Sequence, residues 1–218
     1  MSVTKKILVI SPHADDEVLG CGGYLIHQSA NEDVRIRLII GTVGGADKRQ
    51  NHDVRESELM SVCEELGASC SVLFDNMDAM LDTIPSRDLT TALDKEIDGF
   101  RPDEIFINYR SRHQDHIKMY DCAMASLRLR EGYRPSFIAF YEYPFIMNDP
   151  GFVGGGIAYH DITDVIDRKV KLFELYSSQI KKSPSPLNEN GIKSLATIRG
   201  MECGCLYAEK FYIQKMTI

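Results

Sequence analysis

The sequence lacks the features of a membrane or secreted protein. None of its apolar runs approaches the roughly 20 residues that a membrane-spanning helix needs. Residues 1–6 lead into a short strand-like run and carry no signal-peptide core or cleavage pattern. We therefore expect a cytoplasmic protein without a membrane span.

An excess of basic residues is missing as well. Lysine and arginine number 25 against 32 aspartates and glutamates, so the formal charge at pH 7 is -7. A nucleic-acid-binding domain needs a basic face, and this charge argues against one. We expect a small-molecule ligand rather than a nucleic acid.

A Cys-x-x-Cys motif, the usual sign of a zinc knuckle, is also absent. The six cysteines are scattered, and only Cys203 and Cys205 lie close together, separated by one glycine. A reduced cysteine in a helical pattern packs as a small hydrophobe, which is how we interpret Cys21 and Cys63. Structural thiols are the simplest interpretation of all six, while a redox role stays open for Cys203 and Cys205.

What the sequence does contain is a regular alternation of strand-like and helix-like segments. The 218 residues, 44% of them apolar, are enough for one buried core, so we treat residues 1–218 as a single domain. Such alternation predicts an α/β fold, a mostly parallel sheet covered by helices on both faces. The expected strands are 5–11, 34–40, 71–74, 103–108, 137–143 and 211–216, and the expected helices are 16–29, 51–66, 88–97, 117–128 and 163–178, with another short helix before the last strand.

Glycines mark two segments of special interest. Gly20, Gly22 and Gly23 lie inside the first expected helix, where they allow a close approach to the sheet. They do not form the dinucleotide-binding fingerprint, which should open a helix rather than sit inside it. Residues 144–158 are rich in glycine and show no regular pattern, which is typical of an active-site lid or of a surface excursion.

The most informative segment is 11–17, which reads Ser-Pro-His-Ala-Asp-Asp-Glu and follows the first apolar strand. In an open α/β sheet, ligands bind beyond the carboxyl ends of the strands. His13, Asp15 and Asp16 at that place can hold a divalent cation and leave one carboxylate free for proton transfer. Alternatively, the two aspartates only offset the helix dipole in the first turn of the next helix.

A second polar cluster follows the strand at 103–108. It carries His113, Asp115 and His116, again just past the carboxyl end of an apolar run. Because the carboxyl ends of parallel strands open on the same crevice, two His/Asp clusters of this kind predict one shared metal site.

The ligand count fits a catalytic zinc ion. Such an ion takes three protein ligands and keeps one position open, and His13, Asp16 and His116 would supply two imidazoles and one carboxylate. These ligands do not distinguish Zn(II) from Fe(II), so the site can also be expected to accept Fe(II) instead of zinc. The same residue types form the facial triad of non-haem iron oxygenases, but those sites are usually built in β-barrels rather than in an alternating α/β chain.

Three further residues would complete a hydrolytic site. Bound metal lowers the pKa of water to about 7, and Asp15 is the natural general base for that water. His113 would protonate a leaving amine or stabilise the oxyanion, with Asp115 hydrogen-bonded behind it as the orienting group. This set predicts metal-assisted hydrolysis of an amide.

Both clusters resemble motifs of the PIG-L/LmbE-like family of zinc-dependent N-acetylglucosaminyl deacetylases. Residues 12–17 look like its Ala-His-Pro-Asp-Asp-Glu motif, and residues 113–116 are similar to its His-Pro-Asp-His motif, with Ala14 and Gln114 in place of the usual prolines. Further matches span nearly the whole chain: Gly20-x-Gly22-Gly23, Arg55-x-x-Glu58, Leu66-Gly67, Ser178-Gln179, Arg199-Gly200 and residues 207–211.

The resemblance implies a Rossmann-like three-layer fold and the same division of roles. It implies metal held by the three ligands named above, Asp15 as base, and His113 assisted by Asp115. We expect an enzyme that removes the N-acetyl group from a small GlcNAc-like sugar or glycoconjugate. An amidase for another small amide and a non-catalytic sugar-binding protein of the same fold are the alternatives, and a homo-oligomer stays open.

Three arginines are candidates for substrate binding. Arg55 stands in a family-like position, and Arg110 and Arg112 precede the second cluster. Guanidinium groups at the mouth of a site can hold phosphate or carboxylate. The alternative for each is an ion pair with nearby acids, which for Arg55 would be Glu56 or Glu58.

Overall fold

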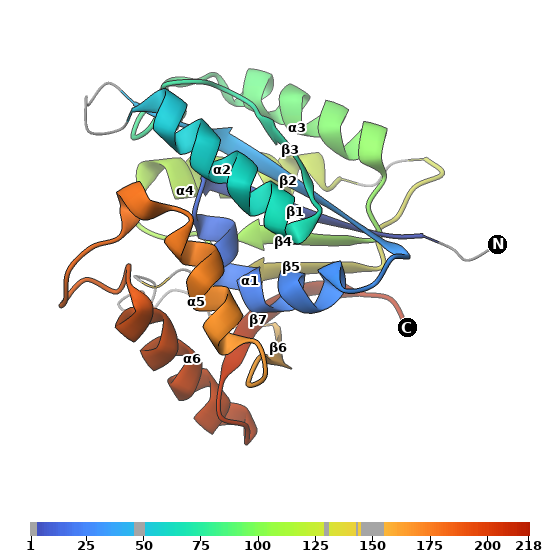
Figure 1. Cartoon of the computed structure of the whole chain (residues 1–218). Helices are drawn as coiled ribbons and strands as arrows, with labels where there is room; N and C mark the ends of the chain where they lie inside the picture. Colours follow the sequence, from blue (N-terminus) through green and yellow to red (C-terminus); the bar gives the residue numbers. More distant parts are fainter. Residues whose placement is uncertain (1–3, 46–50, 129–130, 143, 145–154) are drawn as a thin grey trace.

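A mostly parallel sheet forms the centre of the protein (Figure 1). The computed structural model describes residues 4–45, 51–128, 131–142, 144 and 155–218. Within these residues seven strands form one sheet in the order β3-β2-β1-β4-β5-β7-β6. The strands are β1 (Lys5–His13), β2 (Val34–Thr42), β3 (Ser69–Val72), β4 (Glu104–Asn108), β5 (Phe137–Tyr141), β6 (Gly156–Asp161) and β7 (Ala208–Met216).

Helices connect the strands and cover both faces of the sheet. They are α1 (Asp16–Ser29), α2 (His52–Leu66), α3 (Ser86–Phe100), α4 (Gln114–Ser126), α5 (Ile166–Glu174) and α6 (Glu189–Cys203), with short 3₁₀ helices η1 (Leu81–Thr83) and η3 (Ser177–Gln179). The prediction of an α/β, Rossmann-like fold is confirmed.

The direction of the chain creates a crevice in the middle of the sheet. Strands β1 to β5 pair in parallel, in the order β3-β2-β1-β4-β5, and β7 then pairs antiparallel with both β5 and β6. After β3 the chain crosses back to the other side of β1 and adds β4 there. Such a switch in strand order leaves a ligand crevice at the carboxyl ends of β1 and β4.

Alternating side chains of β1 show how the core divides into two layers. Ile7 and Val9 pack in one cluster with α1, α2 and α5, whereas Leu8 and Ile10 pack in the other with α3 and α4 (Figure 1). All four side chains are fully buried. A strand that is apolar on both sides is what a parallel sheet covered on both faces requires.

Helix α1 lies unusually close to the sheet and to its neighbours. A side-chain carbon at Gly20 would overlap the ring of Tyr141, and one at Gly23 would come within 2.5 Å of Ile162 Cγ2. The expected close approach of this helix is therefore confirmed, and it depends on glycine at these two positions.

The structure differs from the sequence-based boundaries in several places. Strand β1 reaches His13, so this ligand candidate is the last residue of a strand rather than part of a loop. The prediction of an irregular segment at 144–158 is wrong at its C-terminal end, because residues 156–158 belong to β6. Strand β6 forms through antiparallel pairing with β7, which is distant in the sequence, so no local sequence pattern predicts it. The proposal of a lid falls mainly on residues 145–154, which lie outside the described residues.

The C-terminal helices also differ in length. The helix expected at 163–178 is α5, followed by the separate turn η3, and the short helix expected before the last strand is the fifteen-residue α6. Among the described residues, no helix combines the length and the apolar character needed to cross a membrane.

Candidate active site

The two polar clusters meet at the crevice between β1 and β4. His13 ends β1, and Asp15 and Asp16 form the start of α1. His113 and His116 lie at the start of α4, which follows β4. The side chains predicted as metal ligands are therefore brought together by the parallel pairing of β1 with β4.

The three candidate metal ligands lie close together, with both histidine rings beside one carboxylate oxygen of Asp16. His13 Nδ1 and His116 Nε2 each lie 3.3 Å from Asp16 Oδ2. One donor atom from each of these residues lies within 4.8 Å of the other two. Asp16 and His116 are almost completely buried, whereas His13 is partly exposed.

Electrostatics favour a cation at this position. Burial opposes ionisation of Asp16, but His116 and His13 hold the pKa of its carboxyl well below the usual range. Burial likewise opposes protonation of His13, but hydrogen bonds to Asp115, Asp16 and Asp78 raise its pKa well above the usual value. Carboxylates that stabilise a proton on an imidazole also have the charge to hold a divalent metal ion. The donor set of two imidazoles and one carboxylate thus fits a zinc or ferrous ion.

The carboxylate of Asp115 is hydrogen-bonded to His13. Its carboxylate Oδ2 accepts a hydrogen bond from His13 Nε2 at 2.9 Å, and backbone amides of Ala79 and Leu81 donate to the same carboxylate at 2.7 and 2.9 Å. The side chain of Asp115 is fully buried. The sequence-based expectation placed this carboxylate behind His113, and the described contacts place it behind a ligand candidate. A carboxylate on the far nitrogen of an imidazole fixes the orientation of a metal-ligating histidine.

His113 is oriented by the backbone of the helix that it caps. The backbone amide of Asp115 donates to His113 Nδ1 at 3.3 Å, so in the neutral ring the proton lies on Nε2. Burial, together with His13 and His116, lowers the pKa of His113. A neutral ring that lines the cavity and carries its proton on Nε2 is suited to donate a hydrogen bond to a negatively charged oxygen.

Asp15 combines backbone strain with a shifted pKa. Its φ of 143° is unusual for a residue with a side chain, and strain of this kind costs on the order of 1–3 kcal/mol. The backbone amide of Asp15 donates to Glu17 Oε2 at 3.1 Å, which helps to hold this conformation. Burial and the neighbouring Asp16 raise the pKa of the Asp15 carboxyl to about 8. A proton-accepting group with a pKa close to neutral is what general base catalysis needs.

A cavity of about 170 Å³ opens over these groups. Its described lining is His13, Asp15, Asp16, Arg55, Asp78, His113, His116, Gln179 and Leu187. Asp78, which sequence analysis did not single out, lies 3.2 Å from His13 Nε2. Asp78 follows strand β3, so the strand-end rule that found the two His/Asp clusters would have found it too.

Of the three predicted arginines, only Arg55 reaches this cavity. Arg55 is 4% exposed, donates to the carbonyl of Ala14 and stacks 5.7 Å from the ring centre of Tyr176. Its Nη1 makes no hydrogen bond to the described residues and lies 4.0 Å from Glu58. Arg55 thus lines the cavity, and its role in substrate binding stays a prediction.

Arg110 and Arg112 lie elsewhere. Both are exposed and outside the described lining of the cavity, and Arg110 pairs with Asp121 of α4 at 3.2 Å. A role of either arginine in substrate binding therefore stays a prediction.

Behind Asp15 and Arg55, two more residues form a buried support. Glu17 and Tyr176 are fully buried, and the Tyr176 hydroxyl donates to Glu17 Oε1 at 2.5 Å. Glu17 thus connects the backbone of Asp15 with the ring beneath Arg55. Glu17 is part of the first sequence motif, whereas its partner Tyr176 lies far along the chain and carried no sequence signal.

Comparison with known proteins assigns this chain to a family of deacetylases. The model of the PIG-L family, described as GlcNAc-PI de-N-acetylase, matches residues 8–127, more than half of the chain. The match includes both His/Asp clusters. The chain belongs to the PIG-L family.

Relatives of this chain agree with that assignment. The chain is 24% identical over 198 residues to a probable N-acetyl-alpha-D-glucosaminyl L-malate deacetylase 2 of Bacillus subtilis, covering 85% of this chain and 88% of the relative. It resembles the crystal structure of the conserved protein TT1542 from Thermus thermophilus, with a TM-score of 0.79, 26% identity and coverage of 97% and 95%. It also resembles N,N'-diacetylchitobiose deacetylase from Pyrococcus horikoshii, with a TM-score of 0.71, 25% identity and coverage of 96% and 84%.

Proposed function

We propose that this protein is a metal-dependent N-acetylglucosaminyl deacetylase that hydrolyses the N-acetyl group of a small GlcNAc-like sugar or glycoconjugate to acetate and an amine. The observation that carries the proposal is the convergence of His13, Asp16 and His116 beside Asp15 in one cavity. Family membership and the deacetylase relatives support the reaction class.

The three ligand residues would hold Zn(II), or Fe(II) in its place. When bound, the ion acts as a Lewis acid on the amide carbonyl and makes water more acidic. The ligand histidine His13 is kept in position by Asp115, as the 2.9 Å hydrogen bond indicates.

The remaining residues supply the proton transfers and charge stabilisation. Asp15 accepts a proton from the attacking water as the carbon–oxygen bond forms. His113 donates a hydrogen bond from Nε2–H to the oxygen that becomes negatively charged, as its tautomer allows. The proton taken by Asp15 can then pass to the leaving nitrogen, which gives acetic acid and an amine, and the acid then passes its proton to the amine to leave acetate and an ammonium group.

Polar groups that line the cavity fit a sugar better than an apolar amide. The guanidinium of Arg55 brings hydrogen-bond donors to this lining, and the half-buried carboxylate of Asp78 brings acceptors. Vicinal hydroxyl groups of a sugar ring can bind both kinds of group. We therefore favour an N-acetylated sugar over another small amide.

Acetate release from a panel of N-acetylglucosamine derivatives tests this proposal. The purified protein is loaded with Zn(II) or Fe(II) and given the free sugar, a simple O-glycoside, a carboxylate-bearing glycoside and a nucleotide-linked sugar. Metal-dependent release from at least one member is the expected result. A protein that binds metal but releases no acetate from any of them would contradict the deacetylase proposal.

Two neighbouring variants separate the roles of base and ligand. Asp15→Asn should reduce turnover by roughly 10²–10⁴-fold while the metal content stays near normal, because a general base contributes about this much. Asp16→Asn should lose the metal as well. If Asp15→Asn also lost its metal, the assignment of Asp15 as base rather than ligand would be wrong.

A further inference from the structure

Two cysteine thiols lie next to each other on the surface, at the end of α6. Cys203 is the last residue of this helix, and its Sγ lies 3.6 Å from Cys205 Sγ. Gly204 between them adopts a φ of 88°, which turns the chain so that both side chains lie on the same side. A disulfide bond is about 2.05 Å long, so closing one requires a shift of only about 1.6 Å between the two sulfur atoms.

The surroundings leave the pair free to react. Neither cysteine is in a disulfide bond, and both thiols make weak S–H hydrogen bonds to backbone carbonyls, from Cys203 to Arg199 and Gly200 and from Cys205 to Tyr207. Cys205 also interacts with the side chain of Asp161. A side-chain carbon built on Gly204 would meet no atom within 4 Å, so there is open space beside the pair. Cys203 itself is exposed, so a small molecule can approach its side chain.

The two cysteines are not equivalent. Cys203 is exposed, whereas Cys205 is half-buried. Burial and the hydrogen bond toward Cys203 raise the pKa of Cys205 to about 11, so Cys205 keeps its proton near neutral pH. An exposed attacking thiol beside a more shielded resolving thiol is the arrangement that thiol–disulfide exchange needs.

We propose that Cys203 and Cys205 form a thiol–disulfide exchange site that reacts with a small disulfide such as glutathione disulfide. The Cys203 thiolate attacks one sulfur of that disulfide, forms a mixed disulfide and releases one glutathione thiolate. Cys205 then loses its proton and attacks the Cys203 sulfur, which closes the Cys203–Cys205 bond and releases the second glutathione. Overall the two protein thiols lose two electrons and two protons, and the small disulfide is reduced to two thiols.

The other cysteines provide an internal comparison. Cys21, Cys63 and Cys122 are buried. Cys70 is half-buried, and a hydrogen bond with Cys63 lowers its pKa to about 7. Cys70 is therefore the competing reactive thiol, and the experiment has to distinguish it from the proposed pair.

Peptide mapping after exposure to glutathione redox buffers makes this distinction. The full-length protein is equilibrated at increasing ratios of oxidised to reduced glutathione, quenched with acid, alkylated with N-ethylmaleimide and digested with trypsin. Cleavage after Arg199 and Lys210 gives the peptide 200–210, which contains Cys203 and Cys205 and no other cysteine. We expect this peptide to lose both labels together, to become two hydrogens lighter, and to regain both labels after reduction.

Single variants test the order of attack. Cys205→Ser should stop at a mixed disulfide carrying one glutathione on Cys203, and Cys203→Ser should react more slowly because the exposed thiol is gone. Cys70→Ser should close the pair like the natural sequence. The proposal is overturned if peptide 200–210 takes up two glutathiones without closing, or if it stays doubly labelled in buffers that modify Cys70.

Discussion

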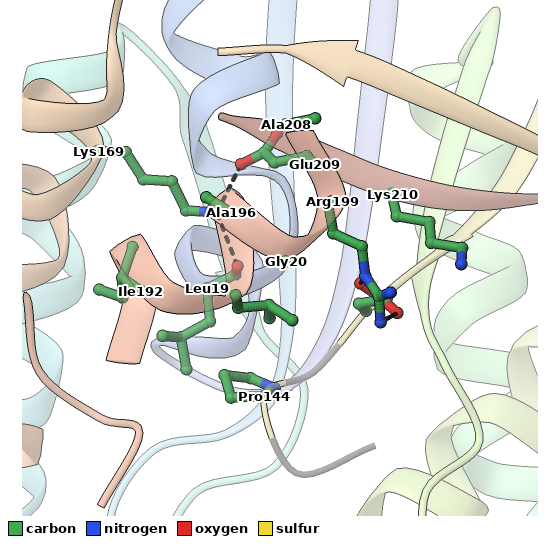
Figure 2. A pocket seen from close by; sticks show the side chains of 12 residues that line it. Leu19, Gly20, Pro144, Lys169, Ile192, Ala196, Arg199, Ala208, Glu209 and Lys210 are labelled. Carbon is green, nitrogen blue, oxygen red and sulfur yellow. Dashed lines mark hydrogen bonds and ion pairs between the residues drawn. The ribbon is translucent and has the colours of Figure 1, made fainter. Parts of the chain in front are cut away.

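Lys169 and Glu209 replace a missing backbone hydrogen bond inside helix α1. The helix is broken at Cys21, whose φ of -139° is not helical. Lys169 Nζ donates to the carbonyl of Leu19 at 2.8 Å and to Glu209 Oε1 at 2.7 Å (Figure 2). Glu209 in turn accepts the backbone amides of Gly23 and Tyr24 at 2.7 and 2.8 Å. This buried pair therefore satisfies the groups that the kink leaves without helical partners.

Removing the cation of this pair should destabilise the fold strongly. Lys169→Met leaves the buried Glu209 carboxylate without its counter-charge, which typically costs about 3–5 kcal/mol of unfolding free energy. Lys193→Met removes an ion pair with Asp167 at the surface and should have a much smaller effect. Urea unfolding of both variants measures the difference. Equal losses would show that the Lys169–Glu209 pair does not support the kink.

The role of Asp115 can be decided by measuring metal affinity. Because its carboxylate binds His13 Nε2, Asp115→Asn should weaken metal binding by roughly 10–100-fold. His113→Gln is the matched control, since it should lose activity with metal affinity near normal. Competition with a chromophoric chelator gives both affinities. An Asp115→Asn variant with unchanged affinity and reduced turnover would instead favour the role behind His113.

Buried Glu17 should make the metal-free protein less stable as the pH rises. Burial raises the pKa of Glu17 to about 7 from a usual 4.5, so the folded state retains this proton over a pH range in which the unfolded state has lost it. Stability is then lost between these two values, by up to roughly 3 kcal/mol from this group.

Urea unfolding between pH 5 and pH 8, in the presence of a chelator, tests this effect. Glu17→Gln should flatten the decrease of unfolding free energy with pH, whatever its effect at a single pH. Glu64→Gln, at an exposed position of α2, should leave the slope unchanged. If Glu17→Gln left the slope unchanged, Glu17 would not be a cause of the loss of stability with rising pH.

Replacing Gly20 of α1 with alanine should lower the stability of the protein, whereas the same change at a glycine of α3 should not. Gly20→Ala would overlap the Tyr141 ring, and overpacking of this kind costs about 1–3 kcal/mol. Gly99→Ala in α3 meets no atom within 4 Å and should stabilise the protein by about 0.5–1 kcal/mol through helix propensity. Thermal or urea unfolding of the two variants should show changes of opposite sign. A stabilised Gly20→Ala protein would contradict the close packing of α1.

Sequence periodicity predicted the layers of this fold because the pattern of each strand or helix lies within a short stretch of the chain. Apolar runs alternate with helical patterns, and that alternation is enough to specify a parallel sheet with helices on both faces. Strand β6 escaped prediction because its partner β7 lies about fifty residues further along the chain, and edge strands of this kind depend on pairing more than on composition.

Part of the candidate site could be predicted in the same way. His13, Asp16 and His116 were found because they follow two strands, and the structure brings them together around one carboxylate oxygen. Arg55 was found through its resemblance to a family position and lines the same cavity. Asp78 follows strand β3 and could have been found by the same rule, whereas Tyr176 was missed because its proximity to the site follows from packing between distant segments.

The sequence by itself determined the strand-end positions of the candidate ligands and the acidic residues beside them, since these follow from patterns within a few residues. Tertiary structure decided which nitrogen of His13 faces Asp16 and which faces Asp115, and it decided that Arg55 is buried in the site while Arg110 pairs with Asp121 outside it. The physical reason is that hydrogen bonds and burial depend on side chains brought together across the sheet, and one-dimensional spacing carries no information about those distances.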